Sequence, residues 1–373
     1  MIAYDKFMSE KYRLERNPFL DYAAQKEHLK FWVDREEDIE EWKKVLSDAS
    51  HGKSNFIAFI IGDYGMGKTL SLFKIIEECK DYKNFFPVAL SFKGEEKSKK
   101  PGVDFIQRIF KFIDFSQIEI NKKDIEKLGV ISKEVRNIYE KIFFGEDEVK
   151  DMALYFLRGE LTPTQSQMRK LGILRKIDDI DIAKEYFKGL LYLLKLTGFS
   201  TLVLAIDEFE YLFSLVTKSQ QPIYLAALRG LYDLPLQFND NKLVNIAFFL
   251  AVSRDGSRKL KELEEIKTGI ETAAIPLMRR VNLGKELEPL SKEATKKLVT
   301  RRLKYNRIEK KFEEDLLIPY TEDFVEFIYE STAGKPGDII KKCGHILDLG
   351  LKYRIPELNE KFAREALRER RIE

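Results

Sequence analysis

The most informative stretch of this sequence is Phe56-Ile-Ala-Phe-Ile-Ile61-Gly62-Asp-Tyr-Gly-Met-Gly67-Lys68-Thr69, in which six apolar residues run directly into a glycine-rich turn. A short, continuous apolar run that ends in glycine is typical of a strand buried in a parallel sheet. The turn fits G-x-x-x-x-G-K-[ST], whose glycines let successive backbone N–H groups point inward and form an anion nest. Residues 70–78 have helical periodicity, so the positive end of a helix dipole adds to this nest. The stretch therefore predicts a phosphate-binding loop between a buried strand and a helix.

The lysine and the hydroxyl residue that end this turn have distinct expected roles. Lys68 would contact the β- and γ-phosphates of a bound nucleotide, and the Thr69 hydroxyl would ligate Mg²⁺. The residues expected to surround the nucleotide are Gly62, Asp63, Tyr64, Gly65, Met66, Gly67, Lys68, Thr69 and Leu70. A chance match to the pattern is expected roughly 0.01 times in a chain of this length. We therefore predict ATP, with adenine as the default base, and Mg²⁺ as cofactors.

A second predicted strand ends in two carboxylates. Leu202–Ile206 is a continuous apolar run, and Asp207 and Glu208 follow it directly. Ligands of parallel sheets bind at the carboxyl ends of the strands, so the pair is expected at the same edge as the phosphate loop. Asp207 would hold Mg²⁺ through water, and Glu208 would polarise the attacking water. An adjacent pair favours ATP hydrolysis over phosphoryl transfer, and the alternative without chemistry is a helix cap.

Composition narrows the class of protein. The chain has 373 residues, with 65 Lys and Arg against 62 Asp and Glu, so its formal charge is only +3. This balance excludes a polybasic chromatin-type protein and an acidic disordered chain. Two cysteines, Cys79 and Cys343, indicate a reducing compartment. No apolar run reaches the ~18–20 residues of a membrane span, and the N-terminus lacks the apolar core of a signal peptide. We expect a soluble, cytoplasmic protein without membrane contact.

The remaining apolar runs predict an α/β fold of P-loop NTPase type. Further buried strands are expected at Val88–Phe92, Leu202–Ile206 and Ile246–Val252. Between the first two of these lie about 110 residues of helical periodicity, far more than an ordinary crossover between parallel strands needs. We therefore expect a helical insertion at about residues 103–200 of a parallel sheet.

Three parts of the chain follow from these patterns. Residues 1–33 are predicted to form an N-terminal arm, and a capping box at Asp34–Glu37 predicts a helix at the start of a nucleotide-binding domain over residues 34–285. Residues 286–373 are predicted to be all helical, with Ser291 capping one helix and Thr321 another.

Together these features resemble the AAA+ ATPases, in the branch of origin-recognition initiators and transposition ATPases. Val33-Asp-Arg35-Glu-Glu-Asp-Ile39 is similar to a segment that packs near the adenine there, which implies a nucleotide contact for Arg35. Ile275-Pro-Leu-Met-Arg279-Arg280-Val281 lies where that branch often places an arginine finger, before the last strand. The resemblance implies a five-stranded parallel sheet, a helical lid over 286–373, and a homo-oligomer in which Arg279 or Arg280 completes a neighbour's site. A solvated arginine pair is the alternative.

The sensor positions depart from the pattern of the initiators. In Ala333-Gly-Lys335-Pro336-Gly337-Asp338, Gly337 stands where the lid of an initiator carries a sensor arginine. Lys335, beside Pro336, is the candidate substitute near the nucleotide; alternatively, γ-phosphate sensing comes from elsewhere. Ser253, at the end of the fourth predicted strand, fits a polar sensor position, and a simple strand-end cap is its alternative.

A narrower resemblance is to the ATP-binding proteins of BREX-type phage-defence loci. It rests on Tyr155-Phe-Leu-Arg-Gly-Glu160, on Arg169-Lys-Leu-Gly-Ile173, and on Leu194–Phe199 followed by Leu202–Glu210. It implies an ATPase that acts on or near DNA in defence or mobile-element control. One alternative is a nucleotide-dependent switch with little turnover that recruits protein partners through the helical insertion. Another is a replication-initiator-like loader.

One segment is a candidate DNA contact despite the small net charge. Residues 296–311 hold eight basic residues and one acidic residue, a local charge of +7. On a helix Lys297, Arg301 and Lys304 share a face, and such a face contacts phosphates without reading bases. A solvated helix face, or one offered to a neighbouring subunit, is the alternative, and no base-reading motif accompanies the segment.

Overall fold

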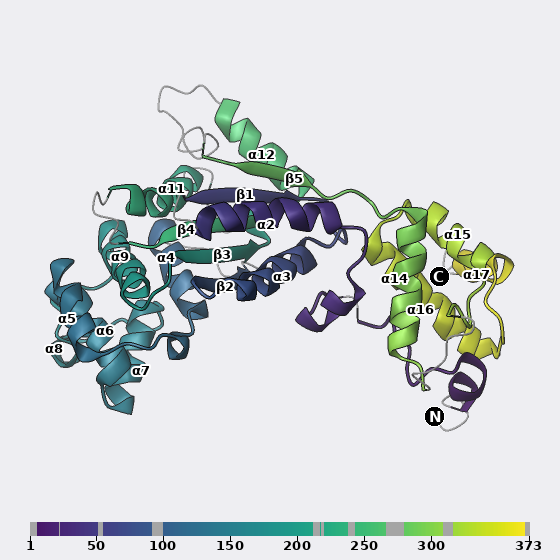
Figure 1. The fold of residues 1–373 in the computed structure, drawn as a ribbon, viewed down its shortest axis with the longest axis horizontal. Coiled ribbons are helices and arrows are strands. Elements are labelled where there is room, and N and C mark those ends of the chain that lie inside the picture. Colours follow the sequence, from purple (N-terminus) through teal and green to yellow (C-terminus); the bar gives the residue numbers. More distant parts are fainter. Residues whose placement is uncertain are drawn as a thin grey trace. The chain divides into compact units, whose positions relative to one another are not determined.

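The computed structural model describes residues 6–21, 23–50, 55–91, 100–211, 217, 220–237, 243–265, 280–308 and 316–369 (Figure 1). In this part of the chain a five-stranded sheet has the order β2-β3-β4-β1-β5. The strands are β1 (Phe56–Ile61), β2 (Phe85–Ser91), β3 (Thr201–Asp207), β4 (Asn245–Val252) and β5 (Leu283–Glu286). The pairs β2–β3, β3–β4 and β1–β4 are parallel. The predicted α/β class, with its P-loop type of sheet, is confirmed.

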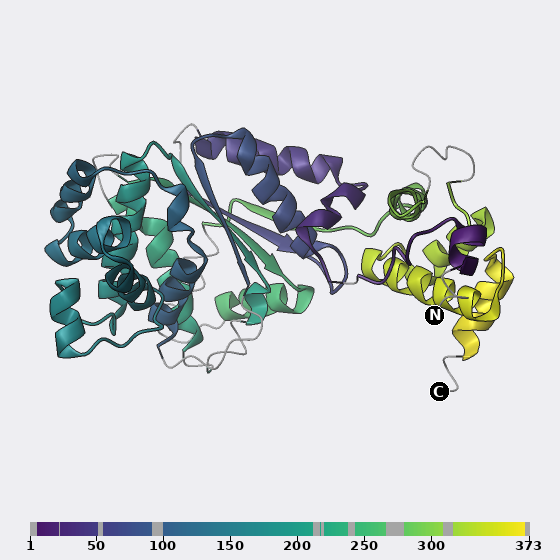
Figure 2. The same ribbon diagram turned by 90° about the horizontal axis from the view of Figure 1, so that it is seen from below.

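The central strands are continuous apolar runs because helices cover both of their faces. Figure 2 shows α2 (Glu36–Ser50) and α3 (Lys68–Glu78) on one side of the strands and α12 (Arg254–Glu265) on the other. Every residue of β3 except its last is buried, as is every residue of β4 except its first. β2 lies at the edge of the sheet, and there it tolerates Pro87, which cannot donate to a strand ladder.

Contacts divide the chain into two compact units. The sheet unit consists of residues 40–61 and 72–285, and the lid unit consists of residues 1–39, 62–71 and 286–373. The phosphate loop is therefore grouped with the C-terminal helices, although it follows β1 directly in the chain.

The predicted helical insertion lies between β2 and β3. It comprises α4 (Pro101–Phe112), α5 (Lys122–Lys127), α6 (Lys133–Phe144), α7 (Asp147–Leu157), α8 (Gln165–Leu171) and α9 (Ile180–Leu196). The buried side chains of these helices join those of the sheet in one hydrophobic cluster, so the insertion extends the core of the sheet unit. A further helix, α11 (Gln221–Gln237), packs against α4 and α9.

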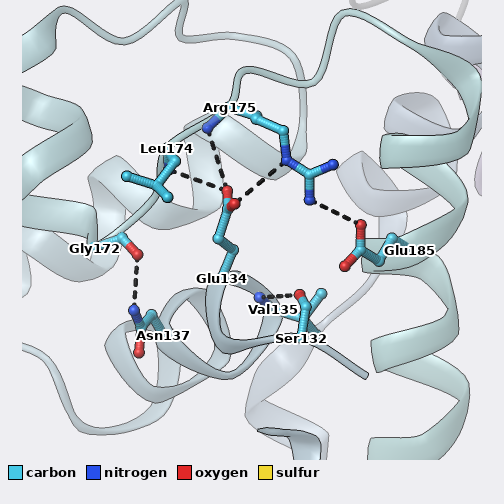
Figure 3. Close-up of polar contacts among 8 residues, drawn as sticks. All are labelled: Ser132, Glu134, Val135, Asn137, Gly172, Leu174, Arg175 and Glu185. Atoms are coloured by element: carbon cyan, nitrogen blue, oxygen red, sulfur yellow. Dashed lines mark hydrogen bonds and ion pairs between the residues drawn. The ribbon is translucent and has the colours of Figure 1, made fainter. Parts of the chain in front are cut away.

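Glu134 ties the loop after α8 to the rest of the insertion (Figure 3). Its carboxylate accepts hydrogen bonds from the backbone N–H groups of Leu174 (3.1 Å) and Arg175 (3.3 Å) and from Nε of Arg175 (3.3 Å). The Arg175 guanidinium also donates to Glu185 on α9 (3.2 Å). Asn137 donates to the Gly172 carbonyl (2.7 Å), so two α6 side chains hold this loop.

The lid unit has its own hydrophobic cluster, to which both ends of the chain contribute. Its C-terminal helices are α14 (Lys292–Tyr305), α15 (Glu322–Thr332), α16 (Pro336–Tyr353) and α17 (Glu360–Glu369). Ser291 caps α14 as predicted, accepting the N–H of Ala294 (3.2 Å). Thr321 occupies the cap position of α15, but its hydroxyl donates to the Leu358 carbonyl and makes no capping bond.

The N-terminal residues are fixed onto these helices. Tyr12 is fully buried, and its hydroxyl donates to the Ile355 carbonyl (2.5 Å). The Asn17 amide donates to the Gly344 carbonyl (3.1 Å) and to Asp348 (2.8 Å). The segment predicted as an arm is thus an integral part of the lid unit over its described residues.

Candidate functional site

The phosphate loop has the backbone that its glycines predict. Gly65 and Gly67 adopt left-handed φ angles of 83° and 95°, which side chains with a Cβ rarely tolerate. Met66 N–H donates to the Asp63 carbonyl (3.2 Å), and Tyr64 at the tip is 86 % exposed. A Cβ added at Gly67 would meet no atom within 4 Å, so this side of the loop is open.

The Lys68 ammonium is held by the loop itself. Lys68 is the first residue of α3, and its Nζ donates to the carbonyls of Gly62 (2.8 Å) and Asp63 (3.3 Å). Thr69 and Leu70 follow in the first turn of the same helix. An ammonium beside the loop and backbone N–H groups at a helix N-terminus form a suitable donor set for a nucleotide's phosphates.

The N-terminus of α16 packs directly against this loop within the lid unit. Gly337 N–H donates to the Gly65 carbonyl (2.9 Å), and a Cβ added at Gly337 would lie 2.8 Å from the Gly65 Cα. Lys335 and Pro336 sit at the same helix end, and Lys335 Cε would lie 3.6 Å from a Cβ at Gly65. A side chain at position 337 therefore does not fit in this arrangement without a shift of the loop backbone.

Arg35 braces the loop from a buried position. It is 7 % exposed, donates to the carbonyls of Met66 (3.2 Å) and Glu288 (2.7 Å), and pairs with Asp38 (3.5 Å). Burial lowers the pKa of its guanidinium, while Asp38 opposes that shift. These contacts position the loop; a direct contact with the nucleotide stays a prediction.

The acidic pair lies at the carboxyl edge of the sheet. Asp207 ends β3, and Glu208 has a left-handed φ of 52°, an unusual conformation that is often found at functional sites. Glu208 N–H donates to the Asp207 carboxylate (2.9 Å). The Ser91 hydroxyl, at the end of β2, donates to the Glu208 carboxylate (3.4 Å). Ser91 was not predicted from the sequence, because its role depends on its register opposite Asp207.

Strand register relates this pair to the end of β1. Ile206 pairs with Leu250 of β4, and β4 pairs with β1 through Val252 and Ile61. One strand therefore separates Asp207 from the point where the phosphate loop begins, about 10 Å at ordinary strand spacing. That the loop and the acidic pair act together on one nucleotide stays a prediction.

The sensor and finger candidates have structural partners. Ser253 Oγ accepts the N–H of Gly256 in α12 (3.0 Å), which is the capping alternative, and a sensor role stays a prediction. Arg280 makes a two-pronged ion pair with Asp233 of α11, at 2.8 and 3.0 Å, and its side chain is 26 % exposed. Arg279 lies outside the described residues.

The chain matches one known protein family over most of its length. A family model described as "BREX system ATP-binding protein BrxC/D" matches residues 110–340, more than half of the chain. The chain belongs to the BREX BrxC/D ATP-binding family. The match includes β3 with its acidic pair, most of the insertion and the start of α16, but it begins after the phosphate loop. The predicted BREX resemblance is confirmed.

Solved structures of other proteins resemble this BrxC/D family member more distantly. Cdc6p from Pyrobaculum aerophilum has a TM-score of 0.48 and 14 % identity, over 98 % of this chain and 70 % of that chain. The Aeropyrum pernix Orc1 protein in complex with DNA has a TM-score of 0.47 and 11 % identity, over 93 % of this chain and 71 % of that chain. The Thermotoga maritima RuvB Holliday junction branch migration motor has a TM-score of 0.41 and 12 % identity, over 90 % of this chain and 69 % of that chain. No curated protein is similar enough to count as a match.

Some basic residues of the segment in this BrxC/D protein are exposed and others are buried. Lys297, Arg301 and Lys304 are exposed on α14, although Arg301 also donates to the Trp32 carbonyl. Arg302 and Arg307 are each 3 % exposed and donate to backbone carbonyls of the N-terminal segment, which include that of Pro18 (2.8 Å). The local charge of +7 therefore overstates what a polyanion would meet.

The described residues offer no candidate metal centre. No group of three or more His, Cys, Asp and Glu there has a metal-binding arrangement. Cys79 and Cys343 are free and buried, and burial raises the pKa of the Cys79 thiol to about 12. Nor does this part of the chain include a helix that is long and apolar enough to cross a membrane.

Proposed function

We propose that this protein is a Mg²⁺-dependent AAA+ ATPase of the cytoplasm that hydrolyses ATP and acts on or near DNA in phage defence or mobile-element control. The family supports ATP binding and the BREX context. The observation that carries hydrolysis is Glu208, which has a left-handed φ directly after β3 and a carboxylate that accepts from Ser91. A fixed carboxylate one strand away from the start of a phosphate loop is suited to activate water.

Each residue of the site has a defined task in this proposal. Lys68 exchanges the carbonyls of Gly62 and Asp63 for phosphate oxygens, and the open side of the loop at Gly67 receives them. Thr69 and Asp207 would hold Mg²⁺, which would supply positive charge against the phosphates. Glu208 accepts a proton from the attacking water.

The remaining candidates would act around this centre. Lys335 at the start of α16 lies near the loop and would sense the γ-phosphate, with Ser253 as a second polar sensor. Arg279 or Arg280 would reach a neighbour's nucleotide in a homo-oligomer, and for Arg280 this requires release of Asp233. DNA would lie along the exposed α14 face of Lys297, Arg301 and Lys304.

Two variants test the assignment of the catalytic carboxylate. Lys68→Ala should lose both ATP binding and turnover, whereas Glu208→Gln should bind ATP normally and hydrolyse it about 10²–10⁴-fold more slowly, the usual contribution of a general base. Glu126→Gln, an exposed carboxylate on α5, is the matched control and should behave as wild type. Phosphate release and fluorescent ATP-analogue binding provide the two readouts. Wild-type turnover in Glu208→Gln would refute the role.

A second candidate function is a nucleotide-dependent switch that recruits proteins through the insertion and turns over slowly. The observation that favours it is an open cavity within the insertion, at the end of α4. Steady-state turnover distinguishes the two functions, because a switch would bind ATP with an intact Lys68 and yet show no difference in phosphate release between wild type and Glu208→Gln.

A further inference from the structure

A cavity of about 660 Å³ opens in the helical insertion of the sheet unit. It lies between the C-terminal end of α4, the segment that follows it, α6 and α7. Its volume falls in the range of about 300–1,000 Å³ that is usual for ligand sites. None of its lining residues belongs to the phosphate loop or the acidic pair, so it is a separate feature of the chain.

The walls of the cavity are apolar. Ile113, Phe115 and Ile142 are buried around it, and Leu154 of α7 adds a partly buried wall. Phe112, the last residue of α4, lines it as well and is 44 % exposed. An exposed aromatic ring beside a buried apolar wall provides a surface on which an incoming apolar side chain can bury area.

Four of the lining residues are charged, and the balance of their charges is positive. Lys111, Lys150 and Arg158 contribute three cations, for which no ion pair with another described residue is found. The Nε of Arg158 is buried without a hydrogen-bond partner, and such a donor is costly to leave unpaired. These three cations are therefore not neutralised by an ion pair within the described residues.

The one carboxylate among the lining residues is already occupied by local contacts. Asp114 accepts hydrogen bonds from the backbone N–H and hydroxyl of Ser116, at 3.1 and 2.6 Å, and from the amide of Gln117 (3.0 Å). These donors lower the pKa of the Asp114 carboxyl, so it stays ionised and faces its own turn. An occupant must bring its own negative charge to balance the three cations.

We propose that this cavity is a docking site for an acidic, apolar peptide segment of a protein partner. An apolar side chain of that segment fills the space against Phe112 and Leu154, and flanking carboxylates accept hydrogen bonds from Lys111, Lys150 and Arg158. The charge complementarity selects acidic over basic segments, and the apolar walls select against polyanions without side chains to bury. The site goes beyond the proposed ATPase and deepens the recruiting role of the insertion.

The probe for this site is a fluorescein-labelled eight-residue peptide, Asp-Phe-Glu-Leu-Asp-Phe-Glu-Leu, whose binding to the full-length protein is followed by fluorescence anisotropy. The comparison peptides replace its acids by lysine or by serine. We expect saturable binding of the acidic peptide, at least tenfold weaker binding of the serine peptide, and none of the lysine peptide. Equal binding of all three, or no binding of the acidic peptide at millimolar protein, would overturn the proposal.

Variants locate the binding. Lys111→Glu with Lys150→Glu changes two exposed side chains and should weaken peptide binding at least tenfold, and Phe112→Ser should weaken it separately. Lys133→Glu, an exposed lysine at the start of α6, is the matched control and should leave binding unchanged. Wild-type affinity in both the double variant and Phe112→Ser would place the peptide elsewhere and refute the site.

Two further outcomes separate this proposal from the others. Lys68→Ala should bind the peptide like wild type, so a failed ATPase assignment leaves the docking result intact. An unlabelled single-stranded oligonucleotide should not compete with the peptide in 150 mM salt. Full competition by the oligonucleotide, abolished in Lys111→Glu with Lys150→Glu, would assign the cavity to nucleic acid and overturn the peptide proposal.

Discussion

The contact between α16 and the phosphate loop predicts the effect of one added methyl group. Gly337→Ala would place a Cβ 2.8 Å from the Gly65 Cα and 3.2 Å from the Gly65 carbonyl oxygen. Ordinary contacts of a Cβ lie at 3.4–4 Å, so the backbones must separate by about 0.6–1.2 Å. Because both partners are backbone atoms, no flexible side chain can absorb this displacement.

The free-energy cost of Gly337→Ala to this contact has two parts. Overpacking by one methyl group costs about 1–3 kcal/mol, and the hydrogen bond from Gly337 N–H to Gly65, now 2.9 Å long, is worth about 0.5–1.5 kcal/mol. Part of the strain is relieved as the hydrogen bond breaks, so we expect about 2 kcal/mol, or roughly a 30-fold shift toward a released loop. Since a released loop must be ordered again around phosphates, ATP affinity should fall by up to this factor.

The assay is titration of Gly337→Ala with a fluorescent ATP analogue, beside Gly284→Ala as the matched control. Gly284 is an exposed glycine of β5 whose added Cβ would meet nothing within 4 Å, so its affinity should stay within twofold of wild type. Gly337→Arg should be at least as weak as Gly337→Ala, although it restores the residue type of an initiator's sensor. Unchanged affinity in Gly337→Ala, or tighter binding in Gly337→Arg, would refute the reasoning.

Three further predictions concern the insertion, the subunit contact and DNA. Glu134→Ala should lower the free energy of unfolding, measured in urea, by about 2 kcal/mol, because two backbone N–H groups lose a charged acceptor. The ion pair with the half-exposed Arg175 adds little to this loss. The control Glu148→Ala breaks an exposed ion pair with Lys170 and should lower the free energy of unfolding by less than about 0.5 kcal/mol. Arg280→Ala should lose turnover yet restore it when mixed with Lys68→Ala; failure of both Arg279 and Arg280 variants to affect turnover would exclude a finger in trans. Neutralising Lys297, Arg301 and Lys304 should reduce the slope of log K for DNA binding against log salt concentration by about 2.7. Neutralising Lys341, Lys352 and Lys361, the control, should leave this slope unchanged.

Local patterns predicted the strands and the loop because the forces that form them act over few residues. Phe56–Ile61 was predicted to the residue, since a strand buried on both faces is a continuous apolar run. β2 was predicted to start three residues too late, at Val88, because Pro87 breaks the run in sequence but is accepted at a sheet edge. Its predicted last residue, Phe92, lies outside the described residues.

The supports of the site could not be predicted in this way. Gly337 meets Gly65, and Arg35 meets Glu288, across more than 250 residues of chain. Nothing in a single sequence relates such positions, because each contact involves backbone atoms that carry no residue-specific pattern. The departure of Gly337 from the initiator pattern was the one signal available, and the steric constraint at this position required the structure.

The basic segment shows that a sequence also does not reveal which of its charged residues are buried. Arg302 is buried over the Phe31 ring, and its pKa is lowered to about 10 by burial. A desolvated guanidinium is stabilised there by the Pro18 carbonyl and the ring, so its function is to hold the N-terminal segment on α14.

In the described part of this segment, the face of Lys297, Arg301 and Lys304 stays exposed for the proposed DNA contact. Three phosphate contacts correspond to a salt slope of about 2.7, well short of the six to ten contacts of a tight DNA-binding protein. A single subunit should therefore bind DNA weakly and release it near physiological salt. Neighbouring subunits would add their own α14 faces, and the effective concentration of the second face would convert weak contacts into strong binding. DNA affinity should consequently rise with assembly, and ATP-dependent assembly would make that affinity depend on the phosphate loop.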